Sequence, residues 1–215
     1  MTKVVVFGVT GYAGGHITAE LVSRGHEVLG IARDVAEAPQ GVEARAGSIF
    51  DEALVREVAS AADQIVVALP ARALEEGGPK LIDALPALVK ASIAGGARLS
   101  FVGGAGSLQV SEGGPKGYDT PEFEPAYLDE ARSHGAILDA LRESDEDLDW
   151  FYVSPAGGFG SWNPGERTGE FRLGGEVLLT DANGDSNISG ADFAIAYVDE
   201  IEQAAHPRGR FTVAY

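Results

Sequence analysis

The first seventeen residues constrain the fold more than any other part of the chain. Lys3 to Phe7 is a short apolar run rich in valine, which predicts a strand buried on both faces of a sheet. The run leads directly into the glycine-rich stretch Gly8 to Gly15, and then into a helical pattern with Ile17, Leu21 and Val22 on one face. A strand, a glycine turn and a helix in this order indicate a unit of a parallel α/β sheet.

The glycines of the turn have the spacing G-x-x-G-x-x-G, which differs from the commoner G-x-G-x-x-G dinucleotide fingerprint. We expect Gly8 to permit the tight turn, Gly11 to let the backbone approach phosphates, and Gly14 to let the helix pack on the strand. Free backbone N–H groups at the start of a helix bind a pyrophosphate, since the helix dipole is positive there. The alternative is a tight turn that binds no ligand.

Length and composition indicate one domain over residues 1–215. The chain is 45% hydrophobic and 23% charged, which is ordinary for a globular protein of this size. No apolar run is long enough to span a bilayer, and no signal-peptide pattern precedes the first strand, so we expect a soluble, cytoplasmic protein. The chain has no cysteine, which excludes disulfides, thiolate metal sites and a cysteine nucleophile.

The net charge of −17 limits which classes of partner the protein can bind. A surface this acidic repels nucleic-acid backbones and anionic membranes, so we expect neither as a partner and favour a small-molecule substrate. The charge would suit a salt-rich cytoplasm, where repulsion between carboxylates is screened, and a halophilic source is therefore a hypothesis.

Further along the chain, apolar strand patterns alternate with helical ones. The pattern predicts a Rossmann-type, doubly wound parallel α/β sheet with small C-terminal elements on the substrate side. We expect strands at 27–32, 42–46, 62–70, 98–102, 149–153 and 210–214, and helices at 51–60, 79–94, 125–143 and 191–203. Segments 170–173 and 176–180 are interpreted as a small hairpin, and the proline-rich stretch 110–125 as a lid or pocket wall.

The second strand ends at Arg33 and Asp34, about twenty residues after the glycine turn, where dinucleotide folds select their cofactor. An acidic residue there binds the ribose hydroxyls of NAD, whereas a cation pairs with the 2′-phosphate of NADP. We favour NADP, with NAD as the other option, because Arg33 should lie over the adenosine pocket while Asp34 turns to solvent. A solvated charge pair in a loop is the competing interpretation.

The stretch from Asp181 to Asp192 imitates a calcium-binding loop in the spacing of its oxygen ligands. It lacks the central glycine and the final glutamate of such loops, so we expect no metal there. The simpler interpretation is a turn at Asn183-Gly184, followed by Ser189 capping the last helix with Asp192 in a capping box. The four histidines show no metal-ligand spacing; His134 either approaches a pocket or is exposed.

Several segments together resemble a known family. They are G-V-T-G-Y-A-G at 8–14, V-G-G-A-G-S-L at 102–108, F-Y-V-S-P-A at 151–156, R-T-G-E-F-R-L-G-G at 167–175 and R-F-T-V-A-Y at 210–215. The whole chain resembles the atypical short-chain dehydrogenase/reductases, and more narrowly the NmrA-like NAD(P)H-binding group that includes flavin reductase and biliverdin reductase B-like proteins.

The resemblance implies a set of cofactor contacts. Thr10, Tyr12 and Ala13 would present groups to the pyrophosphate beside Gly8, Gly11 and Gly14. Ser48 and Ile49 would lie against the adenine edge. Ala68, Leu69 and Pro70 would pass under the ribose, and Pro155 would border the nicotinamide. Each also has a plain interpretation as a strand end.

The chain departs from the main-line family in its catalytic residues. The usual tyrosine followed four residues later by a lysine is absent, because no tyrosine has a lysine at that spacing. Ser107 stands where the family's active-site serine follows the fifth strand, and its hydroxyl would donate to a substrate carbonyl. Alternatively, Ser107 only shapes the loop.

Without a proton relay, hydride transfer remains feasible to electron-poor acceptors such as flavins or quinones, which need positioning more than acid catalysis. Phe159, Trp162 and the 110–125 loop would supply an apolar wall for a planar acceptor, or simply pack on the core. The sequence therefore predicts an NADP(H)-dependent oxidoreductase acting on a small or planar acceptor (flavin, quinone or carbonyl), as a monomer or homodimer. The alternatives are a non-catalytic redox sensor that binds the dinucleotide and, third, an NAD-dependent epimerase.

Overall fold

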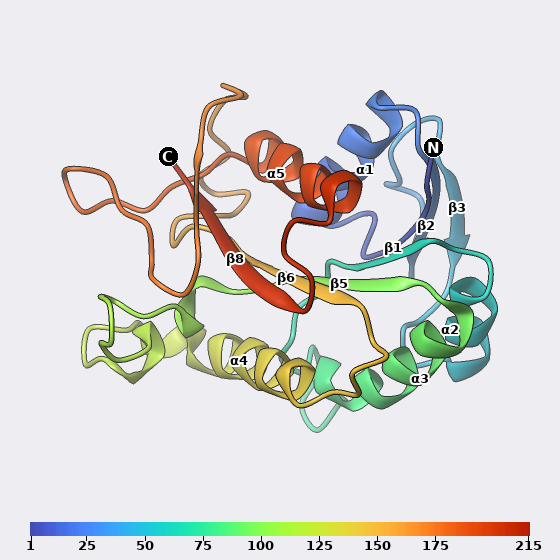
Figure 1. Ribbon diagram of the computed structural model, residues 1–215, viewed down its shortest axis with the longest axis horizontal. Helices are drawn as coiled ribbons and strands as arrows, with labels where there is room; N and C mark the ends of the chain where they lie inside the picture. The colour runs from blue at the N-terminus through green and yellow to red at the C-terminus, as the bar shows by residue number, and fades with distance from the viewer.

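The order of the strands places the glycine turn at the middle of the molecule. The computed structural model describes all residues, 1–215, and contains one eight-stranded sheet in the order β3-β2-β1-β4-β5-β6-β8-β7 (Figure 1). Every neighbouring pair is parallel except β7 and β8, which are antiparallel. The strands are β1 Lys3–Phe7, β2 Glu27–Ala32, β3 Glu43–Ala46, β4 Gln64–Val67, β5 Arg98–Val102, β6 Trp150–Ser154, β7 Arg172–Gly174 and β8 Gly209–Ala214.

The side of β1 on which successive strands are added changes between β3 and β4, although β1 and β4 are parallel. From β1 the chain proceeds outward to β2 and β3, then returns to the other side of β1 as β4. In doubly wound sheets this change leaves a crevice at the carboxyl ends of the strands, where ligands bind. The Rossmann-type fold predicted from the sequence is therefore confirmed.

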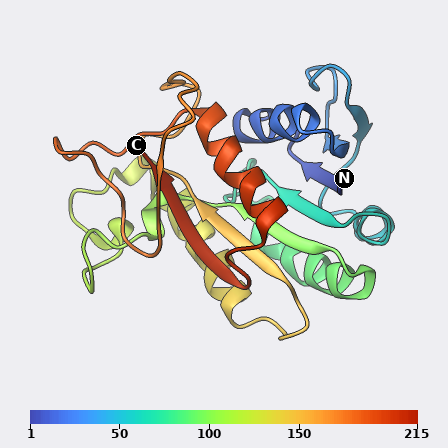
Figure 2. The same ribbon diagram turned by 45° about the horizontal axis from the view of Figure 1, so that its top comes forward.

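Helices cover both faces of the sheet. They are α1 Tyr12–Ser23, α2 Glu52–Ala59, α3 Leu85–Gly95, α4 Leu128–Arg142 and α5 Gly190–Gln203. Helices α2, α3 and α4 lie on one face, and α1 and α5 lie side by side on the other (Figures 1 and 2). In β1, Val5 and Phe7 point into the first core layer while Val4 and Val6 point into the second, which explains the uninterrupted apolar run.

Two helix caps follow their predicted chemistry. The Asp51 carboxylate accepts hydrogen bonds from the amides of Ala53 and Leu54, at 2.9 and 3.1 Å, at the start of α2. The Ser189 hydroxyl accepts from the Asp192 amide at 3.0 Å at the start of α5. The second half of the predicted capping box is missing, because the Asp192 carboxylate is used elsewhere.

Asp192 is fully buried and binds the R-T-G-E segment instead. Its carboxylate accepts hydrogen bonds from the amides of Thr168 and Gly169, from the Thr168 hydroxyl, and from the Tyr215 hydroxyl at 2.7 Å. The carboxylate is therefore turned inward, away from Asp181 and the loop that imitates a calcium site. Two of the family-like segments, 167–175 and 210–215, are thus joined through one carboxylate.

Two predictions about elements were wrong. The predicted helix 79–94 is divided into a 3-10 turn, Leu81–Ala84, and α3, because Pro86 lacks an N–H and fits only the first turn of an α-helix. The predicted hairpin at 170–180 does not form. β7 pairs with β8, and the following segment pairs with Gln109, whose amide donates to the Glu176 carbonyl at 2.8 Å.

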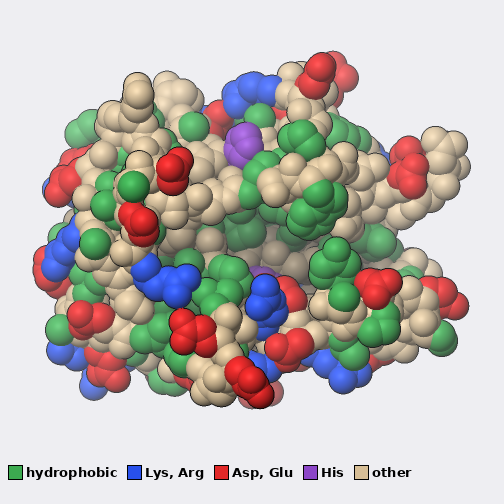
Figure 3. Space-filling view, turned by 180° about the vertical axis from the view of Figure 1, so that it is seen from behind, with side chains coloured by type: hydrophobic (Ala, Val, Ile, Leu, Met, Phe, Trp, Pro, Cys, Tyr) green, Lys and Arg blue, Asp and Glu red, His purple; other side chains and the backbone are tan.

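On the face seen in Figure 3, the charged side chains are spread rather than gathered in one patch. Figure 3 shows acidic groups scattered over one face, interspersed with Lys and Arg, around a hollow with hydrophobic walls. No helix has the length and apolarity required to cross a bilayer.

Candidate functional site

The turn between β1 and α1 requires glycine at two of its positions. Gly8 has a φ of +89°, and a Cβ there would lie 2.2 Å from the carbonyl oxygen of Ala68. A Cβ at Gly14 would lie 2.1 Å from the carbonyl oxygen of Gly8. The first glycine therefore makes the turn and the third brings α1 against it, as the spacing predicted.

The N-terminus of α1 is open and free of negative charge. The amides of Tyr12, Ala13 and Gly14 precede the first intrahelical hydrogen bond, which Gly15 donates to the Gly11 carbonyl at 2.8 Å. Gly11 is the N-cap and offers no side chain, and no acidic residue lies in the first turn. These amides are available to an anion, and the helix dipole favours one there.

A cavity of about 850 Å³ opens at this turn. Its walls come from the carboxyl ends of β1 and β2, from the segment between β3 and α2, and from the segment after β4. Most of the cofactor residues predicted from the sequence line it together: Gly8, Thr10, Gly11, Arg33, Ser48, Ile49, Ala68, Leu69 and Pro70. The volume and the mixture of apolar and polar groups suit one half of a dinucleotide.

Four predicted cofactor residues lie outside the wall of this cavity. Ala13 and Gly14 continue the turn as the first residues of α1, and Gly14 is buried. The Tyr12 hydroxyl accepts from the Gly190 amide at 3.0 Å and donates to the Pro164 carbonyl at 3.3 Å, so this side chain braces a neighbouring loop. Pro155 is buried at the end of β6. Their contacts with a cofactor stay predictions.

Arg33 and Asp34 differ in the contacts that their charged groups make. Arg33 is exposed at the rim of the cavity, and its guanidinium makes no ion pair, unlike that of Arg45 on the neighbouring strand, which pairs with Glu57. Asp34 accepts a hydrogen bond from the amide of Ala36 at 3.0 Å, which holds its carboxylate in a local turn. Neither residue forms an ion pair, and only the Asp34 carboxylate is held by a hydrogen bond, which leaves the Arg33 guanidinium free to bind an anion.

The segment after β4 supplies lining residues that the sequence did not single out. Arg72 and Leu74 belong to the cavity wall, and Arg72 is half-exposed. The only local signal was a cation two residues beyond Pro70, the end of the strand predicted from the sequence. The segment carries no apolar periodicity, and its role depends on a contact with α4.

That contact is made by Glu130, whose carboxylate accepts from the amides of Ala71 at 2.8 Å and Arg72 at 3.0 Å. Its Oε1 also lies 3.0 Å from Nε2 of His134, one turn along α4. Burial by itself would raise the pKa of Glu130, but the bonds from His134 and the two amides lower it to about 2. His134 is buried rather than exposed, and its Nδ1 has no hydrogen-bond partner.

Ser107 is buried at the end of a short 3-10 turn, Ala105–Ser107, after β5. Its hydroxyl oxygen accepts from Nη1 of Arg210 at 2.8 Å. The neighbouring hydroxyl of Tyr152 donates to the carbonyl of His134 at 3.1 Å, and burial raises the pKa of this tyrosine far above its usual value. The hydroxyls near the end of β5 are thus engaged with the protein itself, and a catalytic role for Ser107 stays a prediction.

The two aromatic residues after β6 have different environments. Phe159 is partly buried, with its ring centroid 4.5 Å from that of Phe193 and 5.3 Å from that of Tyr12. Trp162 is 71% exposed. Of these two candidates for an acceptor wall, Phe159 belongs to the core and Trp162 remains free. The 110–125 stretch packs on α4 and on the 105–107 turn, as an ordered part of the surface.

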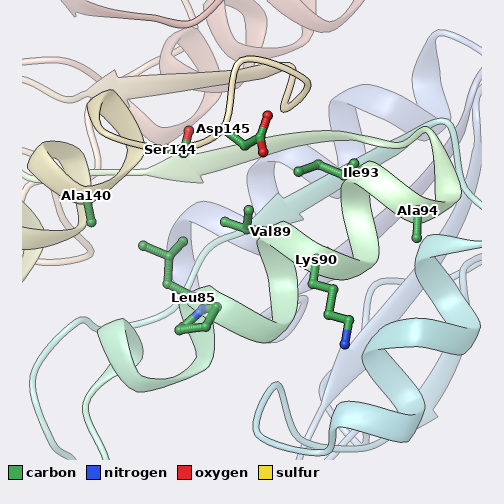
Figure 4. Close-up of a pocket in the computed structure, with 9 residues that line it drawn as sticks. Leu85, Val89, Lys90, Ile93, Ala94, Ala140, Ser144 and Asp145 are labelled. Carbon is green, nitrogen blue, oxygen red and sulfur yellow. The ribbon is translucent and has the colours of Figure 1, made fainter.

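A second hollow of about 590 Å³ lies on the outer surface between α3 and α4 (Figure 4). Leu85, Val89 and Ile93 line it on α3, and Ala140 faces them from α4. Lys90 and Asp145 are its only charged lining residues. It is shallow and mostly apolar, and it includes no residue of the glycine turn. The residues predicted to bind a cofactor line the cavity beside that turn instead.

Comparison with known proteins also indicates binding of a nicotinamide dinucleotide. The model of a family described as NAD(P)H-binding matches residues 8–204. The uncharacterized protein YwnB of Bacillus subtilis (strain 168) is 37% identical over 218 residues, which cover 98% of this chain and 97% of the relative.

Crystal structures of two similar proteins cover nearly all of both chains. A "putative exported protein" from Burkholderia pseudomallei is 36% identical, with a TM-score of 0.85 and full coverage of each chain. A "putative NADH-flavin reductase" from Streptococcus pneumoniae TIGR4 is 33% identical, with a TM-score of 0.79, and covers 100% of this chain and 99% of that one. The chain therefore belongs to the NAD(P)H-binding family.

Proposed function

We propose that this protein is an NADP(H)-dependent oxidoreductase that reduces a planar, electron-poor acceptor such as a flavin or a quinone. The observation that carries the cofactor preference is the unpaired Arg33 guanidinium at the rim of the cavity, beside an Asp34 carboxylate that is held by the Ala36 amide. A free cation at this position favours a 2′-phosphate, because guanidinium and phosphate form paired, charge-assisted hydrogen bonds.

The residues around the cavity fit a dinucleotide. The free amides at the start of α1 would bind the pyrophosphate, which can approach closely because Gly8 and Gly14 have no side chains. Ser48 and Ile49 would contact the adenine, and the 68–70 segment would contact the ribose. The bound cofactor supplies a hydride, and one proton per turnover comes from water.

The acceptor class follows from the hydroxyls near β5. The Ser107 hydroxyl is buried against Arg210, and the Tyr152 hydroxyl donates to a helix carbonyl. Both residues are buried in this conformation, and Tyr152 already donates its proton within the protein, so an acceptor that needs position more than protonation is favoured over a simple carbonyl. The description of the related Streptococcus protein as a "putative NADH-flavin reductase" supports this class.

The same hydroxyl contacts favour a second candidate, a non-catalytic sensor that binds the dinucleotide and reports its redox state to a protein partner. The two candidates share the cavity and differ in turnover. The cytoplasmic location and the choice between monomer and homodimer stay predictions from the sequence.

The test is a fluorescence titration of the protein with NADPH and NADH, followed by absorbance at 340 nm after addition of FMN or a quinone. The expected result is tighter binding of NADPH, by about tenfold or more, with oxidation when the acceptor is added. Equal affinities would contradict the NADP preference. Tight binding without oxidation by either acceptor would replace the reductase with the sensor.

A further inference from the structure

Trp162 is exposed to solvent, although its indole is one of the largest apolar groups of any side chain. It is 71% exposed, whereas Trp150, the other tryptophan, is 1% exposed in the core. Burial of an indole is favourable in proportion to the apolar area removed from water. A chain that leaves this area exposed on an ordered loop leaves it available to a ligand.

The loop that carries Trp162 is fixed to the rest of the molecule. The Asn163 side-chain amide donates to the Gly158 carbonyl and to Oδ1 of Asn187, both at 2.9 Å. The Asn163 backbone amide donates to the Gly160 carbonyl at 3.0 Å, and the Gly158 amide donates to the Ser186 carbonyl at 2.7 Å. The 158–163 loop is therefore tied to the segment that precedes α5.

Gly160 sets the orientation of the indole. A Cβ at this position would lie 2.1 Å from Cζ3 and 2.2 Å from Cη2 of Trp162. The six-membered ring thus lies directly against the Cα of Gly160, and only glycine leaves room for it. The ring is supported by backbone on this side, and most of its remaining surface faces solvent.

Both flanks of the loop contact the residue that opens α1. Before Trp162, the ring centroid of Phe159 lies 5.3 Å from that of Tyr12. After Trp162, the Pro164 carbonyl accepts a hydrogen bond from the Tyr12 hydroxyl at 3.3 Å. The loop follows β6, the strand beside β5, so it lies at the carboxyl edge of the sheet and next to the amides proposed to bind the pyrophosphate.

We infer that Trp162 is a stacking platform that binds the planar ring of the acceptor beside the dinucleotide. This inference rests on the proposed function and names the residue that selects the acceptor. Indole is electron-rich, and the isoalloxazine and quinone rings are electron-poor and flat, so a stacked pair is favourable. Trp162 therefore affects the affinity for the acceptor and does not affect the affinity for the dinucleotide.

The test compares Trp162→Ala and Trp162→Phe with the unmodified protein, at saturating NADPH and varied FMN. Tyr127→Ala is the matched control, since Tyr127 is another exposed aromatic, at 59%, in the turn before α4. We expect Trp162→Ala to raise the KM for FMN about tenfold, Trp162→Phe to raise it less, and Tyr127→Ala to leave it unchanged. The affinity for NADPH should change by less than about twofold in all three.

The tryptophans give an independent readout. FMN should quench the emission of the unmodified protein with saturation, and Trp162→Phe, which keeps only buried Trp150, should lose most of that quenching. An unchanged KM for FMN in Trp162→Ala, with turnover retained, would overturn the inference and leave the reductase intact. If the unmodified protein binds NADPH without turnover, the reductase fails, and the quenching decides: saturable quenching lost in Trp162→Phe supports the platform, and its absence overturns it.

Discussion

Arg210 on β8 donates a hydrogen bond from Nη1 to the hydroxyl oxygen of Ser107 over 2.8 Å. The Arg210 side chain is 1% exposed, and its Nη2 pairs with Glu176, whose carboxylate also accepts from Arg142. Burial alone would raise the pKa of Glu176, but the two arginines lower it. The serine predicted to be catalytic is therefore part of an ion-pair network that joins β8 to the loop after β5.

Ser107→Ala tests whether this hydroxyl is structural or catalytic. Removal of the acceptor leaves a buried guanidinium N–H without a partner, so the free energy of unfolding should fall by about 1–3 kcal/mol. The control is Ser92→Ala, which removes a buried hydroxyl that has no hydrogen bond and should be nearly neutral. Denaturant unfolding measures both. If Ser107 also relays a proton, turnover will fall by about 10²–10⁴-fold with NADPH affinity retained; a loss of stability alone contradicts that role.

Arg33→Ala tests the cofactor preference. Loss of the guanidinium should weaken NADPH binding by about 10- to 100-fold and leave NADH binding nearly unchanged, because only NADPH carries the 2′-phosphate. Fluorescence titration measures both affinities. Arg56→Ala removes the same charge from an exposed position on α2 that does not line the cavity, and serves as the control. Equal losses for the two cofactors would rule out the proposed pairing.

Gly14→Ala tests the close approach of α1 to the turn. The new methyl group would lie 2.1 Å from the Gly8 carbonyl oxygen, so we expect a loss of about 2–3 kcal/mol or more in stability and loss of dinucleotide binding. At Gly15 the nearest atom is 3.6 Å away, so Gly15→Ala should be tolerated and should gain up to about 1 kcal/mol of helix stability. Thermal unfolding and NADPH titration distinguish the pair; similar behaviour of both variants would contradict the packing.

Glu130→Gln tests the link between α4 and the cavity wall. The folded pKa of Glu130, about 2, lies below its ordinary value of 4.5, so the carboxylate stabilises the fold above pH 4.5 and loses that contribution as pH falls toward 2. The variant should be less stable by about 2 kcal/mol at neutral pH and should lose this part of the acid dependence. Urea unfolding between pH 2 and 7 measures both effects, and an unchanged pH profile would show that the link contributes little.

Salt dependence tests the halophilic hypothesis. With a net charge of −17, repulsion between surface carboxylates should fall as KCl shortens the Debye length from about 10 Å at 0.1 M to about 3 Å at 1 M. The melting temperature should rise by about 2–4 °C for each kcal/mol gained. Sucrose at matched osmolality controls for exclusion of the solute. A melting temperature that does not change with KCl would remove the hypothesis.

The parts of the fold predicted from the sequence are those that local pattern determines. The valine run of β1 and the glycine spacing of the turn are complete within seventeen residues, so the turn beside which the cavity opens could be predicted from the sequence. Asp51 and Ser189 each cap a helix through an amide two or three residues away. These signals act over short separations, where the sequence alone specifies the partner.

The parts that were missed depend on contacts between distant residues. Glu130 binds the Arg72 amide across 58 positions, and Arg210 binds Ser107 across 103. β7 is three residues long, with no apolar alternation, and its pairing is decided by β8 some forty residues later. No periodicity in the sequence carries such information, since it depends on which surfaces the completed sheet leaves open.

The shortness of the two outermost strands affects how copies of this protein could meet. At one end of the sheet, the outermost strand offers three residues, including the exposed Arg172. At the other end, β3 offers four residues, with Glu43 and Arg45 exposed. Short, charged outer strands resist the addition of a further strand. Extension of the sheet from one molecule into the next is disfavoured at both ends, which protects the chain from aggregation by strand addition and leaves helices and loops as the surfaces through which a homodimer would form.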